Sequence, residues 1–366
     1  MEKINVRSKS NELVSVFKQY FGREINLARI KLMSLFIISL CKVQTVNFER
    51  LANGFESGVS TSSSLRRIQR FIADFDLNSD LIARFIFMLL PEKDNLCLSI
   101  DRSNWQFGCF DINIFMLGIC YKGLAFPLLF KMLPKRGNSN TEERIKLLEK
   151  FIDLFGKECI EVLVADREFV GDAWIKYLNH NEIKYYVRIR NNFKVYLPRK
   201  QEEFKVFWLF NHLKTNEFYS YPHIVRIGNQ LCYLSGKKII EKDKGVSFLI
   251  IISFKQSGKA DEVYAQRWQI ETCFKAMKSS GFNIEKTHLK DVDRVKKLIL
   301  LVMIAYVWCY KVGIYLDQNI KKINRKKHGR NAKSLVRYGL DYISTRLLNQ
   351  YSKIDNINMF CFLSCT

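Results

Sequence analysis

The chain has 366 residues, of which 48% are apolar, so it can form two or three domains with packed cores, and this composition argues against global disorder. Lys and Arg number 59 against 36 Asp and Glu, a formal net charge of +23. So large a surplus indicates a polyanionic partner, because basic side chains neutralise phosphates and release condensed counterions. Nucleic acid is the first expectation and an anionic membrane surface the second.

The cysteines and the longest apolar stretches narrow the class of protein. The ten cysteines form no CxxC pair and have no histidine at ligand spacing, which argues against a zinc site and favours free thiols in a reducing cytoplasm. The stretches 32–40 and 298–310 are shorter than the roughly 20 residues of a membrane-spanning helix, so both are predicted to be buried core helices. No secretory signal is recognisable in residues 1–20.

Residues 1–92 are predicted to form a helical N-terminal domain that binds DNA, since apolar positions recur there at spacings of three and four. After a polar break, residues 64–75 are predicted to form a basic helix with Ser or Thr as its N-cap. Arg66, Arg67 and Arg70 lie in its first two turns. A short basic helix after a turn is typical of one that enters a DNA groove. The alternative is a solvated basic face on a small helical bundle.

From residue 93 the pattern changes to strands and helices in alternation. The predicted elements are strands over 95–108, 112–123 and 124–133, a helix over 138–156, a strand over 159–169, a helix over 171–183 and a strand over 184–190. Tight spacing and glycine punctuation predict that the first three strands are adjacent and antiparallel. This order of elements is that of the ribonuclease-H-like fold, a mixed α/β sheet flanked by helices. It consists of three strands, a helix, a strand, a helix and a strand.

The catalytic core is therefore predicted over 93–190 and, after an interruption, over 257–312. Between them, residues 191–256 read as a β-rich insertion with basic side chains among short strands. A basic helical region follows over 313–366.

This C-terminal region contains a strongly basic segment, residues 321–337, with eight Lys or Arg and no acidic residue. Lys326, Lys327 and Arg330 are among them. Such runs are solvated and bind phosphates without reading the base sequence, so the segment is expected to grip DNA non-specifically. A nuclear localisation signal is the other common interpretation of such a run.

Two aspartates follow predicted strands. Asp101 ends LSID and Asp166 ends VLVAD. Neighbouring strands of a mixed sheet can place both carboxylates at one edge, where rigid strands fix them and substrate can reach them. Taken singly, an aspartate at a strand end is usually a turn former. Glu168 is an alternative to Asp166, because positions i and i+2 of an extended strand face the same way.

A third carboxylate lies on the predicted helix that contains YAQRWQIETCFKAMK. At about 100° per residue, Tyr264, Arg267, Glu271 and Lys278 share one face of this helix about 60° wide. A helix face directed at the core would be apolar, so this polar face suggests a helix that presents a site. The alternative is that Glu271 is a solvated partner of Lys275 at i,i+4.

Asp101, Asp166 and Glu271 together can bind two Mg²⁺ ions, because hard divalent cations prefer oxygen ligands. Such ions activate an attacking water or hydroxyl and stabilise the leaving oxygen of a phosphodiester. Arg267 and Lys278 are expected to hold substrate phosphates, with Tyr264 as a further hydrogen-bond donor to the DNA. The residues alone thus point to a metal-dependent, nuclease-like site.

The spacing Tyr-x2-Arg-x3-Glu-x6-Lys from Tyr264 to Lys278 resembles the signature of DDE transposases of the insertion-sequence-four group. The segments LSIDRSNWQFG and VLVADREFVGDAW resemble that family's two aspartate motifs, and the resemblance covers roughly residues 90–345. It implies a ribonuclease-H-like catalytic domain with a β-strand insertion. It also implies that Asp101, Asp166 and Glu271 are the metal-binding triad, with Mg²⁺ or Mn²⁺ as the ions.

The implied activity is cut-and-paste transposition, in which the ends of the element are cleaved and the freed 3′-hydroxyl attacks target DNA. Some members make a DNA hairpin and stack a flipped base on a tryptophan of the insertion. Trp208 lies in that region, although an apolar strand is an alternative place for it. The expected partners are double-stranded DNA and a second copy of the chain, at the nucleoid in the cytoplasm and without a membrane. The alternatives are a stand-alone Mg²⁺-dependent nuclease of this fold and a domesticated DNA-binding protein.

Overall fold

The computed structural model describes residues 9–56, 58–107, 110–241, 245–327, 329, 331–348 and 357–364. The chain divides into two compact units. The unit called here the sheet unit comprises Glu92–Asn104 and Asn113–Cys273. The helical unit comprises Met1–Pro91, Trp105–Ile112 and Phe274–Thr366.

The sheet unit is organised by one 11-stranded sheet in the order β3-β2-β1-β4-β5-β11-β10-β9-β6-β7, with β8 beside β10. The strands are β1 Leu96–Phe107, β2 Phe110–Tyr121, β3 Leu124–Met132, β4 Ile160–Ala165, β5 Tyr185–Ile189, β6 Lys194–Leu197, β7 Glu202–Lys205, β8 Phe218–Ser220, β9 Val225–Ile227, β10 Gln230–Glu241 and β11 Gly245–Ser253. β4 runs parallel to β1 and to β5, whereas β3 is antiparallel to β2. The order 3-2-1-4-5 is that of the ribonuclease-H-like fold, so the predicted fold class is confirmed.

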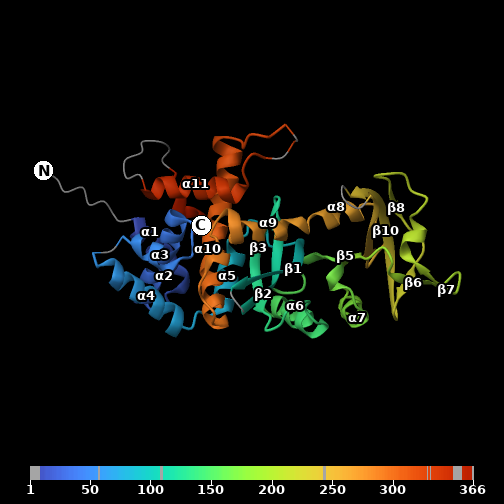
Figure 1. Cartoon of the computed structure of the whole chain (residues 1–366), viewed down its shortest axis with the longest axis horizontal. Helices are drawn as coiled ribbons and strands as arrows, with labels where there is room; N and C mark the ends of the chain where they lie inside the picture. Colours follow the sequence, from blue (N-terminus) through green and yellow to red (C-terminus); the bar gives the residue numbers. More distant parts are fainter. Residues whose placement is uncertain are drawn as a thin grey trace. The chain divides into compact units, whose positions relative to one another are not determined.

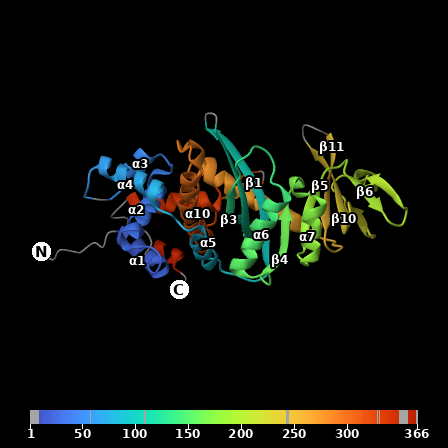
Figure 2. The same ribbon diagram turned by 90° about the horizontal axis from the view of Figure 1, so that it is seen from below.

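Three helices of the sheet unit cover the two faces of its sheet. They are α6 Thr141–Phe155, α7 Asp172–His180 and α8 Ala260–Ala265. Figure 1 shows α6 and α7 on one side and α8 on the other, and Figure 2 shows α6 and α7 beside β4 and β5. α6 begins at a capping box, in which Asn140 and Glu143 each accept from the other's backbone N–H, and it ends at Gly156 with φ +88°.

The strands of the predicted insertion continue the same sheet. β11 lies antiparallel to β5, with Ile250 opposite Ile189 and Ser253 opposite Tyr186. β10 then pairs along β11. The insertion is therefore joined to the catalytic sheet by a backbone hydrogen-bond ladder, which local sequence patterns do not encode.

The helical unit packs around one long helix. Its α-helices are α1 Lys9–Phe21, α2 Leu27–Val43, α3 Phe48–Asn53, α4 Thr61–Asp74, α5 Ser79–Met88, α10 Val292–Tyr315 and α11 Leu335–Leu348. Residues 298–310 of α10 are all buried, and most of 32–40 is buried in α2, as predicted for core helices. The α10 helix is longer than its apolar stretch. With its continuation to Ile320 it is long and apolar enough to cross a membrane, but 83% of its most apolar window is buried inside the protein.

α10 and α11 touch through their backbones at two glycines. A Cβ atom on Gly339 would lie 1.9 Å from the carbonyl oxygen of Cys309, and one on Gly313 would lie 1.9 Å from that of Leu335. Only glycine allows this approach. Figure 1 shows these C-terminal helices beside the N-terminal α1 to α5, so the helical unit joins the two ends of the chain.

Candidate active site

The parallel pairing of β1 with β4 brings the two aspartates to one place. The register matches Ile100 with Ala165, the last residues of this pairing, so Asp101 and Asp166 are the next residues of two neighbouring parallel strands. β1 continues past Asp101 to Phe107, in agreement with the predicted strand over 95–108, so Asp101 lies within the strand and not at its end. What ends after Ile100 is the pairing with β4, because β4 stops and the chain turns.

Asp101 lies in an environment that disfavours its charge. Burial raises the pKa of Asp101 to about 7, and the negative charges of Glu271 and Glu168 add to the rise. The backbone N–H of Arg102, which donates to Oδ1 at 2.7 Å, and the charge of Arg267 oppose it. A nearby cation therefore stabilises the charged form of this carboxyl group.

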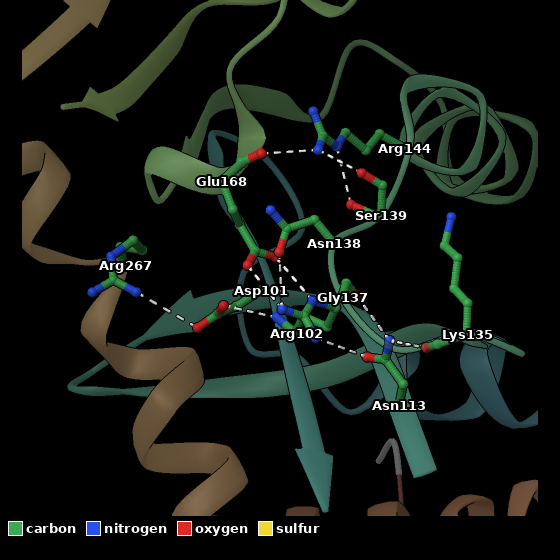
Figure 3. Close-up of polar contacts among 10 residues, drawn as sticks. All are labelled: Asp101, Arg102, Asn113, Lys135, Gly137, Asn138, Ser139, Arg144, Glu168 and Arg267. Atoms are coloured by element: carbon green, nitrogen blue, oxygen red, sulfur yellow. Dashed lines mark hydrogen bonds and ion pairs between the residues drawn. The ribbon is translucent and has the colours of Figure 1, made fainter. Parts of the chain in front are cut away.

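Arg267 supplies such a cation and brings Glu271 to Asp101. Its side chain is only 3% exposed, and its Nη1 lies 2.6 Å from Glu271 Oε1 and 3.5 Å from Asp101 Oδ2. Glu271 is more open, at 38% exposed. Because both carboxylates reach the same nitrogen, the helix places Glu271 within the same small site as Asp101. Figure 3 shows Arg267 directed at Asp101.

Tyr264 contacts the remaining aspartate. Its hydroxyl donates to Asp166 Oδ1 at 3.3 Å, and burial raises the pKa of Tyr264, so the hydroxyl keeps its proton. The expected partner of this hydroxyl was a DNA phosphate, whereas here it orients Asp166.

The predicted continuous helix over Tyr264–Lys278 is wrong. α8 ends at Ala265, α9 spans Trp268–Lys275, and a π-helical segment, η3, covers Ala276–Ser280. The four residues share one face only in a regular α-helix, and a break and a π turn both change the rotation per residue. Tyr264, Arg267 and Glu271 still converge in the sheet unit, as their contacts with the aspartates show.

Lys278 belongs to the helical unit. Its Nζ lies 2.8 Å from Glu285 Oε1 and 5.4 Å from the ring centre of Trp105. The structure therefore shows Lys278 in an ion pair within that unit.

Glu168 does not share the direction of Asp166. β4 ends at Ala165, and Arg167–Phe169 forms a 3-10 turn, η1, so the extended geometry assumed for the alternative is absent. The carboxylate of Glu168 instead pairs with Arg102. Asp166 is the better candidate ligand of the two.

The donor set suits a hard divalent cation. Among the described residues, no group of three or more His, Cys, Asp or Glu lies close enough together to hold a metal ion. The chemistry nevertheless fits, since Asp101 and Glu271 already share one cation, the guanidinium of Arg267, and all three candidate ligands offer carboxylate oxygens. In this structure the guanidinium of Arg267 supplies the positive charge that a metal ion would supply to these carboxylates.

The remaining predicted DNA contacts are on the protein surface where the structure describes them. On α4, which starts at Thr61 rather than Ser64, Arg66 and Arg70 are exposed and Arg67 is half-buried. The exposed residues Lys326 and Lys327 precede Arg330, which lies outside the described residues.

Trp208 is not in an apolar strand. It lies on a 3-10 turn, η2, over Val206–Leu209 and is 58% exposed.

Sequence reasoning missed several polar residues around the aspartates. Arg102, Asn113, Ser139 and Arg144 form a network that reaches Glu168 (Figure 3). The only signal was Arg102 directly after Asp101. The other residues of the network lie on β2, in the loop after β3 and on α6. They are far apart in the sequence, so no local sequence pattern shows that they meet.

Trp268 was also missed. Its side chain is exposed, and its ring centre lies 4.6 Å from the guanidinium carbon of Arg267.

Comparison with known proteins gives one family. A family model described as Transposase DDE domain matches residues 120–308, a span that contains Asp166 and Glu271 and begins after Asp101. Among curated proteins, none matches the chain with statistical significance. Among solved structures, the chain is similar to a piggyBac transposase synaptic complex with hairpin DNA, determined by cryo-EM. The TM-score is 0.46 and the identity 12%, over 96% of this chain and 80% of that chain.

Proposed function

Because the chain belongs to the Transposase DDE domain family, and is therefore a DDE transposase, we propose that it binds the ends of its own insertion sequence and moves that element by cut-and-paste transposition. The spacing from Tyr264 to Lys278 supports its placement in the insertion-sequence-four group. The observation that carries the proposal is the convergence of Asp101 and Glu271 on one nitrogen of Arg267, with Asp166 next to Asp101 by strand register.

DDE transposase domains generally use divalent metal ions, and we propose that Asp101, Asp166 and Glu271 hold two of them, Mg²⁺ or Mn²⁺. When bound, such ions activate the attacking water or 3′-hydroxyl and stabilise the leaving oxygen of the phosphodiester. The strands fix the two aspartates, and Tyr264 orients Asp166 through its hydroxyl. Rigid supports of this kind keep ligands in place before the substrate arrives.

Arg267 and Tyr264 are proposed to hold DNA phosphates beside the cleaved bond, and Lys278, in the helical unit, is also proposed to bind a DNA phosphate. This role requires each to exchange a protein partner for a phosphate oxygen. Nε of Arg267 is buried and has no hydrogen-bond partner among the residues described, so it can donate to a phosphate only if the side chain moves.

Wider DNA contacts are proposed for three surfaces. They are the exposed arginines of α4, the basic segment 321–337 and the exposed Trp208, whose ring is available for stacking on a base. The net charge of +23 supports a DNA partner. Two element ends must be brought together, so a homodimer on DNA is also proposed, at the nucleoid.

The test is cleavage of DNA that contains the element ends, taken from the flanks of the protein's own gene. Wild-type protein with Mg²⁺ is expected to nick this DNA and join the 3′ end to a target, with products resolved on a denaturing gel. Glu271→Gln is expected to bind the same DNA without cutting it, because one metal ligand is lost while the bulk of the side chain remains.

The outcomes separate the alternatives. Cleavage without joining indicates a stand-alone nuclease. Binding without any cleavage by the wild type indicates a DNA-binding relative, and cleavage by Glu271→Gln contradicts the assignment of the third ligand.

A further inference from the structure

An arginine on β1 makes a two-point contact with the glutamate that follows Asp166. Nε of Arg102 donates to Oε1 of Glu168 and Nη2 donates to Oε2, both at 3.2 Å. A forked contact of this kind fixes the orientation of both groups, and a lysine cannot reproduce it. Both oxygens of Glu168 are engaged, two residues after a candidate metal ligand.

The guanidinium of Arg102 is also fixed from its other side (Figure 3). Nη1 donates to Asn113 Oδ1 at 3.2 Å, and Nη2 donates to Asn138 Oδ1 at 3.1 Å. Asn113 is buried, and its amide donates to the carbonyl oxygens of Lys135 and Gly137 at 2.8 and 3.1 Å. Arg102 therefore sits in a cradle made by β2 and the loop after β3, and its position does not depend on its acidic partner alone.

A second arginine holds the backbone of Glu168. Arg144 on α6 is buried, and its Nη2 donates to the carbonyl oxygens of Glu168 at 2.9 Å and Ser139 at 2.6 Å. Its Nε donates to Ser139 Oγ at 3.0 Å. Since Glu168 is anchored through both its side chain and its backbone, the turn η1 is fixed against β1.

We infer that Arg102 is a positioning residue that keeps Glu168 out of the metal site, an inference that rests on the proposed function. A free glutamate two residues from Asp166 is a competing ligand, because hard divalent cations bind carboxylate oxygens that reach them. The contact with Arg102 holds both oxygens against the guanidinium, so the side chain cannot turn to a metal ion without breaking both hydrogen bonds. Arg102 thus leaves Asp166 as the available carboxylate of this segment, and it also neutralises a negative charge beside Asp101.

The test is a double-mutant cycle of Arg102→Met and Glu168→Gln, read by Mn²⁺ binding. Free Mn²⁺ is followed by electron paramagnetic resonance during titration of the full-length protein. We expect Glu168→Gln to leave Mn²⁺ affinity unchanged while Arg102 is present, since Glu168 is then not a ligand. In the Arg102→Met background the same change is expected to weaken Mn²⁺ binding about tenfold, because the released glutamate has joined the site.

Cleavage of end-containing DNA provides the second readout. Arg102→Met is expected to cut roughly 10–100-fold more slowly than wild type, the usual range for residues that position metal ligands. Adding Glu168→Gln removes the misplaced carboxylate, so the double variant is expected to recover at least about threefold, within the coupling found between contacting residues. A purely structural ion pair predicts no recovery, because the double variant cannot rebuild it.

Two further variants make the result decisive. If Arg102→Met does not show the cooperative unfolding of a folded protein, Arg102→Lys takes its place in the cycle. Lysine keeps the positive charge but cannot make the two-point contact with Glu168. Lys237→Met removes another partly buried ion pair of the sheet unit, with Asp261 at 3.0 Å, and is expected to behave as wild type in both assays. Wild-type protein that binds Mn²⁺ but cuts no DNA contradicts the proposed function, while the Mn²⁺ cycle still tests Arg102.

The inference is overturned if Glu168→Gln changes Mn²⁺ affinity equally in both backgrounds. It is also overturned if Arg102→Met cleaves as fast as wild type, or if the double variant cleaves no faster than Arg102→Met.

Discussion

Replacing Arg267 by glutamine removes the cation between Asp101 and Glu271, and the resulting loss of stability is expected to grow with pH. Breaking a buried ion pair costs about 3–5 kcal/mol. Glu271 is partly exposed, so water screens its charge. The free energy of unfolding is therefore expected to fall by about 2–3 kcal/mol near pH 8. This loss comes mainly from the two carboxylates left without a counterion.

The pH dependence follows from Asp101. Its folded pKa, about 7, lies above the ordinary 3.8, so in the wild type the associated stability is present at low pH and is lost as pH rises to about 7. The charge of Arg267 lowers this pKa, and its removal raises the value further. The variant should therefore keep losing stability above pH 7, by up to about 1.4 kcal/mol per pH unit, where the wild-type curve has levelled off.

The assay is urea unfolding followed by circular dichroism in EDTA at pH 6, 7 and 8. The difference between wild type and Arg267→Gln is expected to be larger at pH 8 than at pH 6. Lys237→Gln, which removes the separate ion pair with Asp261, is the control, and its effect is expected to be the same at all three pH values. A difference for Arg267→Gln that is constant or shrinks from pH 6 to pH 8 would refute the reasoning.

Three other substitutions test the site and the packing. Asp101→Asn is expected to abolish cleavage of end-containing DNA while gel-shift binding is retained, and residual cleavage would remove Asp101 from the ligand set. Gly339→Ala is expected to lower the free energy of unfolding by about 1–3 kcal/mol, because the new methyl group meets the Cys309 carbonyl oxygen, whereas Gly171→Ala, with open space around it, is the control in the same urea titration. Asn140→Ala is expected to cost about 1 kcal/mol by the same measurement, since α6 loses its capping box.

The order of strands and helices along the catalytic core was predictable because these elements alternate and carry local signals. The cap at Asn140 and the glycine at 156 marked α6, and continuous apolar residues marked β4. The pairing of β11 with β5 was not predictable, since a strand's partner is chosen by long-range packing. The full length of α10 was missed for a related reason, as its first turns contain Lys296 and Lys297 outside the apolar stretch.

The candidate site was predictable in its residue types and only partly in its contacts. Asp101 and Glu271 both contact the buried guanidinium of Arg267, and strand register places Asp166 beside Asp101. The binding of a metal ion by all three carboxylates stays a prediction, because among the described residues no such group of three lies close enough to hold one. The contact of Tyr264 with Asp166 was not predicted, and the assumption of a regular helix through Arg267 was wrong. A single sequence shows which side chains are polar, but the break after α8 and the turn after Asp166 depend on tertiary packing.

The ladder between β5 and β11 means that the insertion also protects the catalytic sheet from aggregation. If residues 191–253 were trimmed away, β5 would become an open edge with unsatisfied N–H and C=O groups. An exposed, flat and apolar edge is a template for pairing with other chains. A shortened transposase would therefore need a replacement strand or a charged edge to remain monodisperse, so the insertion can be exchanged more readily than it can be deleted.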